Sequence, residues 1–542
     1  MAKQRRIIVA DCETDPFENG ARIEPFIWGA FDGETYNEFQ ETNEFAEWAK
    51  DQHALIYAHN GGKFDWHFLV PHFEAHTRIM TIAGRVAKVP FGMAELRDSY
   101  SILPVPLSEM QKDEFDYSKM HKDVRHLHMP EIREYLRNDC EYLHEYVTEY
   151  INEYGRNLTV ASAALAQWRK ITKKQTPRTN ASFYEKFAPY YYGGRVECFR
   201  KGVIKAPFKV IDINSAYPRA MMDKHPWGAE YVELDALPEK GVERCFITMT
   251  AKSLGAFPIR EKTGLSFPSD GEIRRFEVTG WEYLAALETG ALQDCAIETV
   301  LSFVDKIDFS EYVDYFYGKK KAAIKDTPPY LFAKLFLNSL YGKWGANPAK
   351  YKEQYIIPPE YIAAAEVNDG LTYAGSLGEM ALMEKPLNES ARRYFNVATA
   401  ASITGWVRAE MWRSLHACSG LIYCDTDSIA AEKIGELEMD KEKLGAWDVE
   451  AVCDEAYVVA KKIYAFSQVE GTYKPKKGKK GGKWKTASKG VRLEPEEIMR
   501  AARGEEVRHE KDAPTFSLKK PLDGMSDKDV EKLYIGRTVR MN

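Results

Sequence analysis

The pattern of apolar and polar positions is clearest at residues 421–431, where two apolar runs flank a short acidic turn. Leu421-Ile-Tyr423 comes before the turn and Ile429-Ala-Ala431 after it. Apolar arms around a tight polar tip predict a β-hairpin. Asp425 and Asp427 at the tip are two residues apart, so on an extended backbone both side chains would point to the same side. Two carboxylates held this close favour a divalent cation between them, although a solvated turn is the alternative.

An earlier strand also ends in an acid. Residues 208–213 are rich in apolar and β-branched positions and include Asp212, and a turn and a predicted helix at residues 219–223 follow. The pattern predicts a buried strand with a carboxylate near its end. Asp212 would then be the third carboxylate that a metal site at the hairpin needs.

An almost wholly apolar helix is expected at residues 328–342, with two prolines at its start and Gly342 as its end. At about 100° per residue, Lys334, Asn338 and Tyr341 form one narrow polar stripe. Leucine and phenylalanine cover the rest of the circumference, so the lysine needs an anionic partner. A nucleoside triphosphate fits, with Lys334 on the phosphates and Tyr341 against the base.

Three segments near the amino terminus supply a second set of acids. Two are apolar strands at residues 6–14 and 55–60. The third is a helix at residues 131–143, in which Tyr135 lies one turn before Asp139. Each acid alone would usually be a helix cap or a surface residue. Together they could hold two metal ions for phosphodiester hydrolysis, with Tyr135 orienting a water. The acids are Asp11, Glu13, Asp65 and Asp139.

Composition and charge are those of an ordinary globular protein rather than of a secreted or membrane protein. The 542 residues should form several domains, and 44% hydrophobic with 29% charged residues is ordinary for a globular protein. A net charge of −6 argues against a uniformly basic coat but permits a local basic channel. Basic runs at 319–325 and 474–485 would contact phosphates or simply be solvated. The eight cysteines are scattered, which suggests neither a zinc site nor a disulfide framework. The apolar run at the amino terminus is too short for a signal peptide, and no run has the length of a membrane span. We therefore expect a soluble intracellular protein.

The amino-terminal segments resemble the three motifs of the DEDD-type 3′–5′ exonuclease domain of family B DNA polymerases. They match Asp-x-Glu, Asn-x3-Phe-Asp (Asn60, Phe64 and Asp65) and Tyr-x3-Asp. Lys112 falls where this family carries a lysine that assists the exonuclease step. The resemblance implies an RNase H-like domain with a proofreading site.

The later segments resemble the polymerase motifs of the same family, in the same order. Asp212 lies in motif A, the 328–342 helix matches motif B, and the hairpin matches motif C. By resemblance, Tyr217 packs beneath the incoming sugar and would clash with a 2′-hydroxyl. Asp212 and Asp425 are implied as metal ligands, with Asp427 as a ligand or a support. The residues implied in DNA binding are Asn60, Phe64, Tyr191, Gly193, Gly194, Lys462, Tyr464 and Lys489.

The chain looks most like the protein-primed, tectivirus-type branch of linear-genome bacteriophages. The fold class is α/β (α+β multidomain), with an RNase H-like exonuclease domain followed by a right-hand polymerase. The implied order is an exonuclease domain (1–155), a linker with a Tyr-x-Gly-Gly motif (156–200), palm (201–244), a terminal-protein insertion (245–312), fingers (313–346), a strand-displacement insertion (347–385), palm (386–450), and palm end with thumb (451–542).

The resemblance also implies ligands and partners. Each active site would use two Mg²⁺ ions, for which Mn²⁺ could substitute, and the partners would be template and primer DNA, dNTPs and a terminal protein. The expected enzyme is a monomer in the cytoplasm of a bacterial host. Two alternatives stay open: an RNA- or DNA-primed family B polymerase, and a nuclease or nucleic-acid-binding protein with a vestigial polymerase site.

Overall fold

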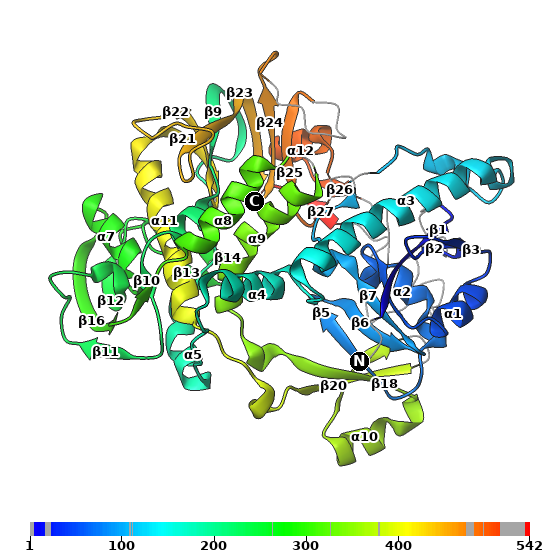
Figure 1. The fold of residues 1–542 in the computed structure, drawn as a ribbon. Helices are drawn as coiled ribbons and strands as arrows, with labels where there is room; N and C mark the ends of the chain where they lie inside the picture. The colour runs from blue at the N-terminus through cyan, green and yellow to red at the C-terminus, as the bar shows by residue number, and fades with distance from the viewer. Residues whose placement is uncertain are drawn as a thin grey trace.

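The computed structural model describes residues 5–16, 23–107, 110, 112–262, 264–325, 327–377, 380–472, 482–491, 493–509 and 537–541. Much of the basic run at 474–485 and part of the expected thumb lie outside these residues. The chain builds two halves, each around its own large sheet (Figure 1). In the part of the chain described, no helix is long and apolar enough to cross a lipid bilayer.

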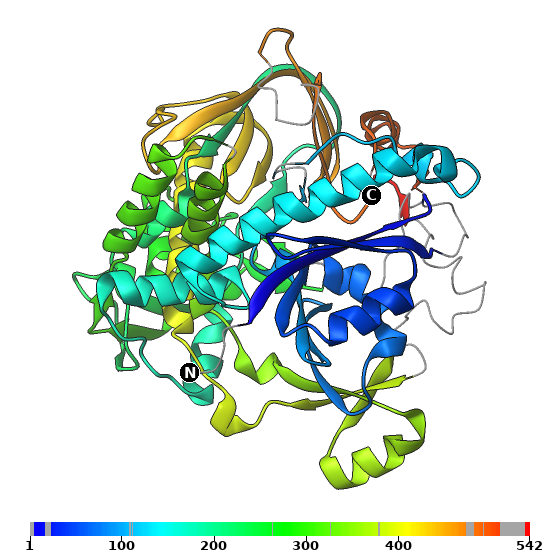
Figure 2. The same ribbon diagram turned by 45° about the vertical axis from the view of Figure 1, so that its right-hand side comes forward.

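The amino-terminal half is organised by a mixed sheet with parallel strands at its centre. β1 (Arg6–Thr14), β4 (Ala54–Ala58) and β7 (Ala94–Asp98) are these strands, and β4 is buried along its whole length, as a strand covered on both faces requires. The long helix α3 (Arg125–Tyr154) runs across the sheet towards the other half (Figure 2). The other elements here are β2 (Pro25–Phe31), β3 (Tyr36–Phe39), α1 (Thr42–Lys50), α2 (Asp65–Phe68), β5 (Thr77–Ile82) and β6 (Arg85–Phe91).

A much later part of the chain completes this sheet. β18 (Lys352–Ile357) pairs with β5, and β20 (Met380–Pro386) and β19 (Thr372–Leu377) extend the sheet to ten strands. Arg78 on β5 and Glu353 on β18 form an ion pair at 2.8 Å. The segment expected as the 347–385 insertion is therefore joined to the amino-terminal half by backbone hydrogen bonds, which no local sequence pattern indicates.

The carboxy-terminal half is built on an antiparallel seven-stranded sheet in the order β25-β24-β23-β9-β22-β21-β8. The predicted strand is confirmed as β9 (Gly202–Ile213), and the predicted hairpin as β21 (Ser419–Asp425) with β22 (Ser428–Lys433). The helix α11 (Val397–Ala417) is buried on nearly every side. The remaining strands are β8 (Val196–Cys198), β23 (Trp447–Ala460), β24 (Ile463–Gln468) and β25 (Trp484–Ser488).

A separate four-stranded sheet lies within the expected 245–312 insertion and also reaches upstream of it. β12 (Cys245–Lys252) pairs with β15 (Arg274–Thr279) and β16 (Gln293–Phe303), and β11 (Tyr231–Leu234) joins through β16. Residue 245 is therefore not the structural start of this unit, because β11 comes before it. The helix α7 (Gly280–Glu288) and the short strands β13 (Ile259–Glu261) and β14 (Gly264–Ser266) complete it.

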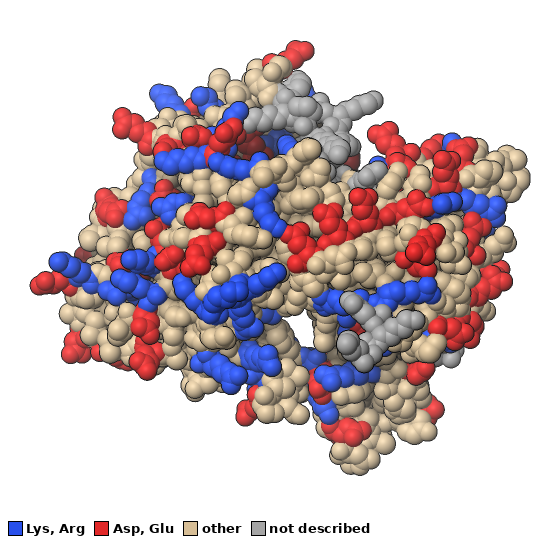
Figure 3. Space-filling view, viewed as in Figure 1, with Lys and Arg blue, Asp and Glu red and all other residues tan. Residues whose placement is uncertain are grey.

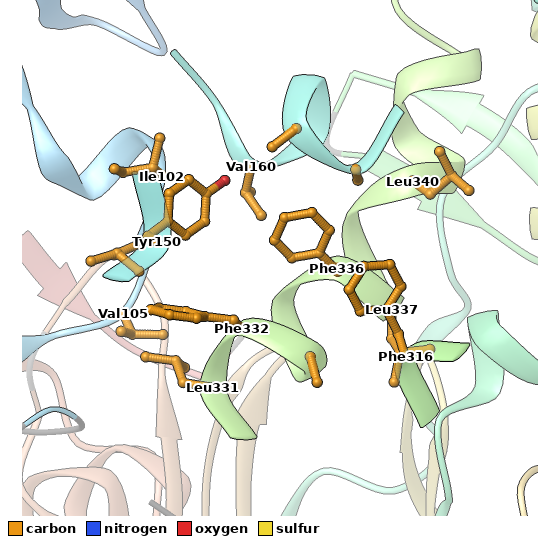
Figure 4. Packing of buried hydrophobic residues seen from close by; sticks show 14 of the residues in the cluster. Ile102, Val105, Tyr150, Val160, Phe316, Leu331, Phe332, Phe336, Leu337 and Leu340 are labelled. Carbon is orange, nitrogen blue, oxygen red and sulfur yellow. The ribbon is translucent and has the colours of Figure 1, made fainter. Parts of the chain in front are cut away.

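One apolar core joins the two halves. Tyr150 on α3 packs edge-on against Phe332 of α9 (Pro328–Trp344), with ring centroids 5.4 Å apart, beside Phe336 and Val160 (Figure 4). A continuous core predicts that the halves move together. The elements that contribute with α9 are α4 (Val160–Thr172) and α8 (Ser310–Ala322).

Two helix boundaries differ from those expected. α9 continues past Gly342 to Trp344, since the Trp344 side chain is fully buried in the core and keeps the last turn helical. The helix expected at 219–223 is α6 (Ala216–Met221), which starts earlier, directly after Ser215 in a left-handed conformation. The chain ends with α12 (Pro495–Ala502), β26 (Val507–His509) and β27 (Arg537–Val539).

Candidate active sites

Three neighbouring strands bring the polymerase-motif acids together. Ser428 on β22 is the cross-strand neighbour of both Asp212 on β9 and Asp425 on β21. Thr426 has a φ of 61°, which is left-handed, so the extended-backbone argument for the pair of acids does not hold at the tip. A tight turn places Asp427 instead, with its backbone N–H donating to the Asp425 carbonyl at 2.6 Å.

The carboxylate of Asp427 acts electrostatically on that of Asp212. Burial raises the pKa of Asp212 to about 8, and Asp427 is the strongest of the neighbouring charges that add to this rise. Burial likewise raises the pKa of Asp427 to about 6, with Asp425 as its main acidic neighbour. Buried carboxylates that repel one another are an environment that favours binding of a divalent cation.

Two further acids on β23 lie at the same place. Asp448 is the cross-strand neighbour of Asp212, and both Asp448 and Glu450 help to raise its pKa. Glu450 also pairs with Lys485 at 2.5 Å. Sequence reasoning missed these two acids, although their two-residue spacing on an apolar strand is the signal that marked the other acidic pairs.

The Lys-x-Tyr segment contacts the hairpin directly. Lys462 Nζ donates to both carboxylate oxygens of Asp425, at 2.6 and 2.7 Å, and its backbone N–H donates to the Tyr423 hydroxyl at 2.8 Å. The ring of Tyr464 lies 4.8 Å from that of Tyr423. Lys489 reaches the same turn through its backbone N–H, 2.9 Å from the Lys462 carbonyl. This segment therefore borders the polymerase-motif acids.

The polar stripe on α9 is as expected. Lys334 and Asn338 are exposed on an otherwise largely buried helix, and the Asn338 amide donates to the Lys334 carbonyl at 2.9 Å. Tyr341 stacks on Tyr217 of α6. Burial and the nearby Lys334 charge lower the pKa of Lys320. An anion such as a triphosphate would offset the repulsion between these two ammonium groups.

The loop with Tyr191, Gly193 and Gly194 borders both the hairpin and α9. The Thr426 N–H donates to the Arg195 carbonyl at 2.6 Å, and a side chain at Gly194 would collide with Thr426. Tyr191 packs against the carboxyl end of α9 so closely that its ring leaves no room for a side chain at Gly345. The loop is thus a wall of the polymerase-motif site.

The amino-terminal acids form a second cluster. Asp11 and Glu13 on β1 lie with Asp65 at the start of α2 and Asp139 on α3, and all four are buried or nearly so. Burial raises the pKa of Asp11, and the charges of the other three raise it further. Burial also raises the pKa of Glu13 to about 8 and that of Asp65 to about 6. Three separate motifs are therefore brought to one place.

Lys112 and Tyr135 complete this second cluster. Lys112 Nζ donates to Asp139 at 3.0 Å and lies 5.2 Å from the centre of the Tyr135 ring. The Tyr135 hydroxyl forms a hydrogen bond of 2.8 Å with the hydroxyl of Tyr117, a residue to which sequence reasoning gave no role. Tyr117 carried no recognisable spacing signal.

The other residues of the second motif hold local structure here. Asn60 has a left-handed φ of 63°, and its side-chain oxygen accepts from Arg85 at 3.1 Å. Phe64 packs edge-on against Phe68, with centroids 5.2 Å apart. Both lie immediately before Asp65 and shape the entry to α2.

Both clusters suit divalent metal ions in their donor chemistry. Each gathers hard carboxylate oxygens whose mutual repulsion a cation would relieve. In each, one carboxylate is paired with a lysine, Asp425 with Lys462 and Asp139 with Lys112. Among the described residues, no three potential ligand side chains converge tightly enough to enclose an ion as they stand.

Known proteins match along most of the chain. The family model for type B DNA polymerases, organellar and viral, matches residues 111–441. The DNA-directed DNA polymerase of Enterobacteria phage PRD1 is 36% identical over 502 residues, which cover 91% of this chain and 87% of the phage protein. The DNA polymerase of Bacillus phage phi29 is 25% identical over 536 residues, 85% of this chain and 86% of that protein.

The fold has a counterpart among solved structures. Phi29 DNA polymerase complexed with primer-template DNA and incoming nucleotide substrates superimposes with a TM-score of 0.76 and 19% identity, covering 99% of this chain and 100% of that chain. This shows that the two chains share one multidomain α/β fold. From the family match and the identity to the PRD1 enzyme, the chain belongs to the organellar and viral type B DNA polymerases.

Proposed function

We propose that this DNA-directed DNA polymerase copies a linear phage genome in the infected cell, starts on a terminal protein, and proofreads with its own 3′–5′ exonuclease. The observation that carries the proposal is the pair of separate carboxylate clusters in one chain, one on the carboxy-terminal sheet and one on the amino-terminal sheet. Phosphoryl transfer and phosphodiester hydrolysis each need such a cluster.

At the polymerase site, Asp212 and Asp425 would hold two Mg²⁺ ions with support from Asp427, and the ions would activate the primer hydroxyl and steady the triphosphate. Lys334 binds the phosphates from the exposed stripe of α9. The stacked Tyr217 and Tyr341 form the wall beside the sugar and base. Lys462 and Tyr464 hold the primer terminus next to the hairpin.

At the exonuclease site, the four buried acids would hold the ions that hydrolysis requires. Lys112 fixes the Asp139 carboxylate, and Tyr135 orients the attacking water, with its own hydroxyl held by Tyr117. Asn60 and Phe64 contact the single strand.

DNA passes between the two halves in this proposal. Figure 3 shows an opening through the molecule with lysine and arginine side chains on both sides of it, while acidic side chains gather above it over α3. Basic side chains around an opening attract the phosphate backbone. The acidic face of α3 would repel it, which confines the strand to the opening.

Protein priming rests on the resemblance and on the two inserted units. The sheet of β11, β12, β15 and β16 would contact the terminal protein, and the strands β18 to β20 would help to displace the downstream strand. The test is incubation of the enzyme with its cognate terminal protein, labelled dNTPs and Mg²⁺, without DNA primer. A labelled protein–nucleotide adduct is expected. No adduct, with normal extension of a DNA primer, would favour an RNA- or DNA-primed polymerase; no extension at all would contradict the polymerase assignment.

A further inference from the structure

Side chains outside the loop at residues 188–194 donate hydrogen bonds to several of its backbone carbonyl groups. Residues 191–194 have no regular secondary structure, so their carbonyl oxygens need partners elsewhere. Two guanidinium groups supply them. Arg260 donates to the carbonyls of Pro189 (2.9 Å), Ala188 (3.3 Å) and Tyr191. Arg408 donates to those of Tyr192 (2.8 Å) and Gly193 (3.0 Å).

Both arginines tie the loop to the four-stranded unit built from β11, β12, β15 and β16. Arg260 lies on β13, inside that unit, and its guanidinium also lies 4.1 Å from the centre of the Tyr192 ring. Arg408 on α11 is buried and donates through Nε to Glu282 on α7 at 2.7 Å. The loop is therefore held by Arg260 of the inserted unit and by Arg408 of α11, which is itself paired with Glu282 of that unit.

Two more contacts strengthen this connection. Tyr190 and Thr248 of β12 share a hydroxyl hydrogen bond of 2.7 Å. Arg195, directly after the loop, donates to the Gly255 carbonyl at 2.9 Å, and its guanidinium lies 4.2 Å from the centre of the Phe267 ring and 4.7 Å from that of Trp412.

The other side of the same loop contacts the polymerase site. The Arg195 carbonyl accepts from Thr426 at the tip of the hairpin, and Tyr191 packs against the end of α9. Gly194 lies too close to Thr426 for any side chain, so the loop backbone packs directly against the tip of the hairpin.

We propose that Arg260 is a positioning residue, which fixes the 188–194 loop for primer–template binding and so couples the inserted unit to the polymerase site. The proposal rests on the proposed function and on the DNA-binding role that the family resemblance implies for Tyr191, Gly193 and Gly194. The Arg260 guanidinium can hold the loop because its planar fork donates to three carbonyls and stacks on an aromatic ring. A lysine cannot reproduce this set of contacts. Because Arg260 is exposed, its replacement leaves the buried core intact.

The test is steady-state primer extension by the full chain carrying Arg260→Ala or Arg260→Lys. We expect the alanine variant to raise KM for primer–template about tenfold with kcat within about twofold, as loss of charged hydrogen bonds to a binding element implies. The lysine variant should fall between, since it keeps the charge and part of the bonding. Arg275→Ala is the matched control: Arg275 is exposed in the same unit but pairs with Glu277 and Glu298 inside it.

The outcomes separate the two proposals. An alanine variant with the KM of the wild type would overturn the role of Arg260. A parallel loss of primer extension, single-strand exonuclease activity and melting temperature would also overturn it, because that pattern means general destabilisation. A wild-type chain that extends no primer would instead overturn the proposed function.

Discussion

The rings of Tyr217 and Tyr341 lie flat against each other, with centroids 4.1 Å apart and planes 8° apart. Tyr217 comes from α6, directly after the strand that carries Asp212, and Tyr341 from the polar stripe of α9. The stack therefore joins two motifs separated by more than a hundred residues into one wall beside the acids. Its geometry leads to the first prediction.

Replacing Tyr217 by valine should relax sugar discrimination. The shorter side chain leaves space where the ring would meet a 2′-hydroxyl, so ribonucleotide incorporation should rise by about tenfold or more relative to deoxyribonucleotide incorporation. Single-nucleotide extension with rATP and dATP measures the ratio. Tyr361→Val, a change at an exposed tyrosine of the 347–385 segment, should leave the ratio unchanged. An unaltered ratio in the Tyr217 variant would contradict its place beneath the sugar.

The two acidic clusters should be separable by mutation. Asp425→Ala should lower nucleotide incorporation on the order of 10³-fold or more while sparing 3′–5′ degradation, and Asp11→Ala should do the reverse. Primer extension and degradation of a labelled single strand, assayed on the same preparations, measure both. Equal loss of both activities in either variant would argue against two independent sites.

Lys112→Ala should selectively weaken the exonuclease. Its ammonium group is the hydrogen-bond donor to Asp139, and its removal should slow degradation by about 100-fold with polymerisation unchanged. The control is Lys119→Ala, because Lys119 is in the same segment but pairs with the exposed Glu131. If both variants degrade single strands like the wild type, Lys112 has no role in that step.

Lys462→Ala should selectively weaken extension. Loss of its two contacts to Asp425 should reduce incorporation by about 10- to 100-fold and leave degradation of single strands intact. Lys461→Ala tests the neighbouring position, where the ammonium group donates to the Leu265 carbonyl instead. Equal defects in the two variants would assign the effect to the turn that carries both lysines rather than to the Asp425 contact.

Glu282→Ala should destabilise the fold. It removes the carboxylate from the buried Arg408 and also the capping partner of Thr279. Breaking one side of a buried ion pair costs about 3–5 kcal/mol, so thermal unfolding should begin at a clearly lower temperature. Glu288→Ala is the control, since Glu288 on the same helix pairs with Arg413 near the surface. Unchanged melting of the Glu282 variant would mean that the pair contributes little.

Local pattern was enough to predict the elements that carry chemistry. The hairpin around Asp425, the strand that ends at Asp212 and the stripe of α9 all have a periodicity that reads directly as structure. The tip was misjudged, because the left-handed Thr426 interrupts the two-residue period. The end of α9 was misjudged for a different reason, since burial of Trp344 outweighed the preference of Gly342 to end a helix.

Non-local relationships could not be predicted. Asp448 lies beside Asp212 because two strands more than two hundred residues apart pair in register, and one sequence does not record that register. Tyr117 beside Tyr135 and the arginines that hold the 188–194 loop also depend on tertiary packing, which has no periodicity in the sequence.

The pairing of β18 with β5 has a consequence for any attempt to isolate the amino-terminal domain. A chain cut after Gly155 would contain all four acids of the amino-terminal cluster, yet β5 would become an uncovered edge strand with free N–H and C=O groups. Such edges recruit strands from other molecules. The fragment should therefore tend to aggregate, and adding back a peptide that spans β18 to β20 should restore its solubility.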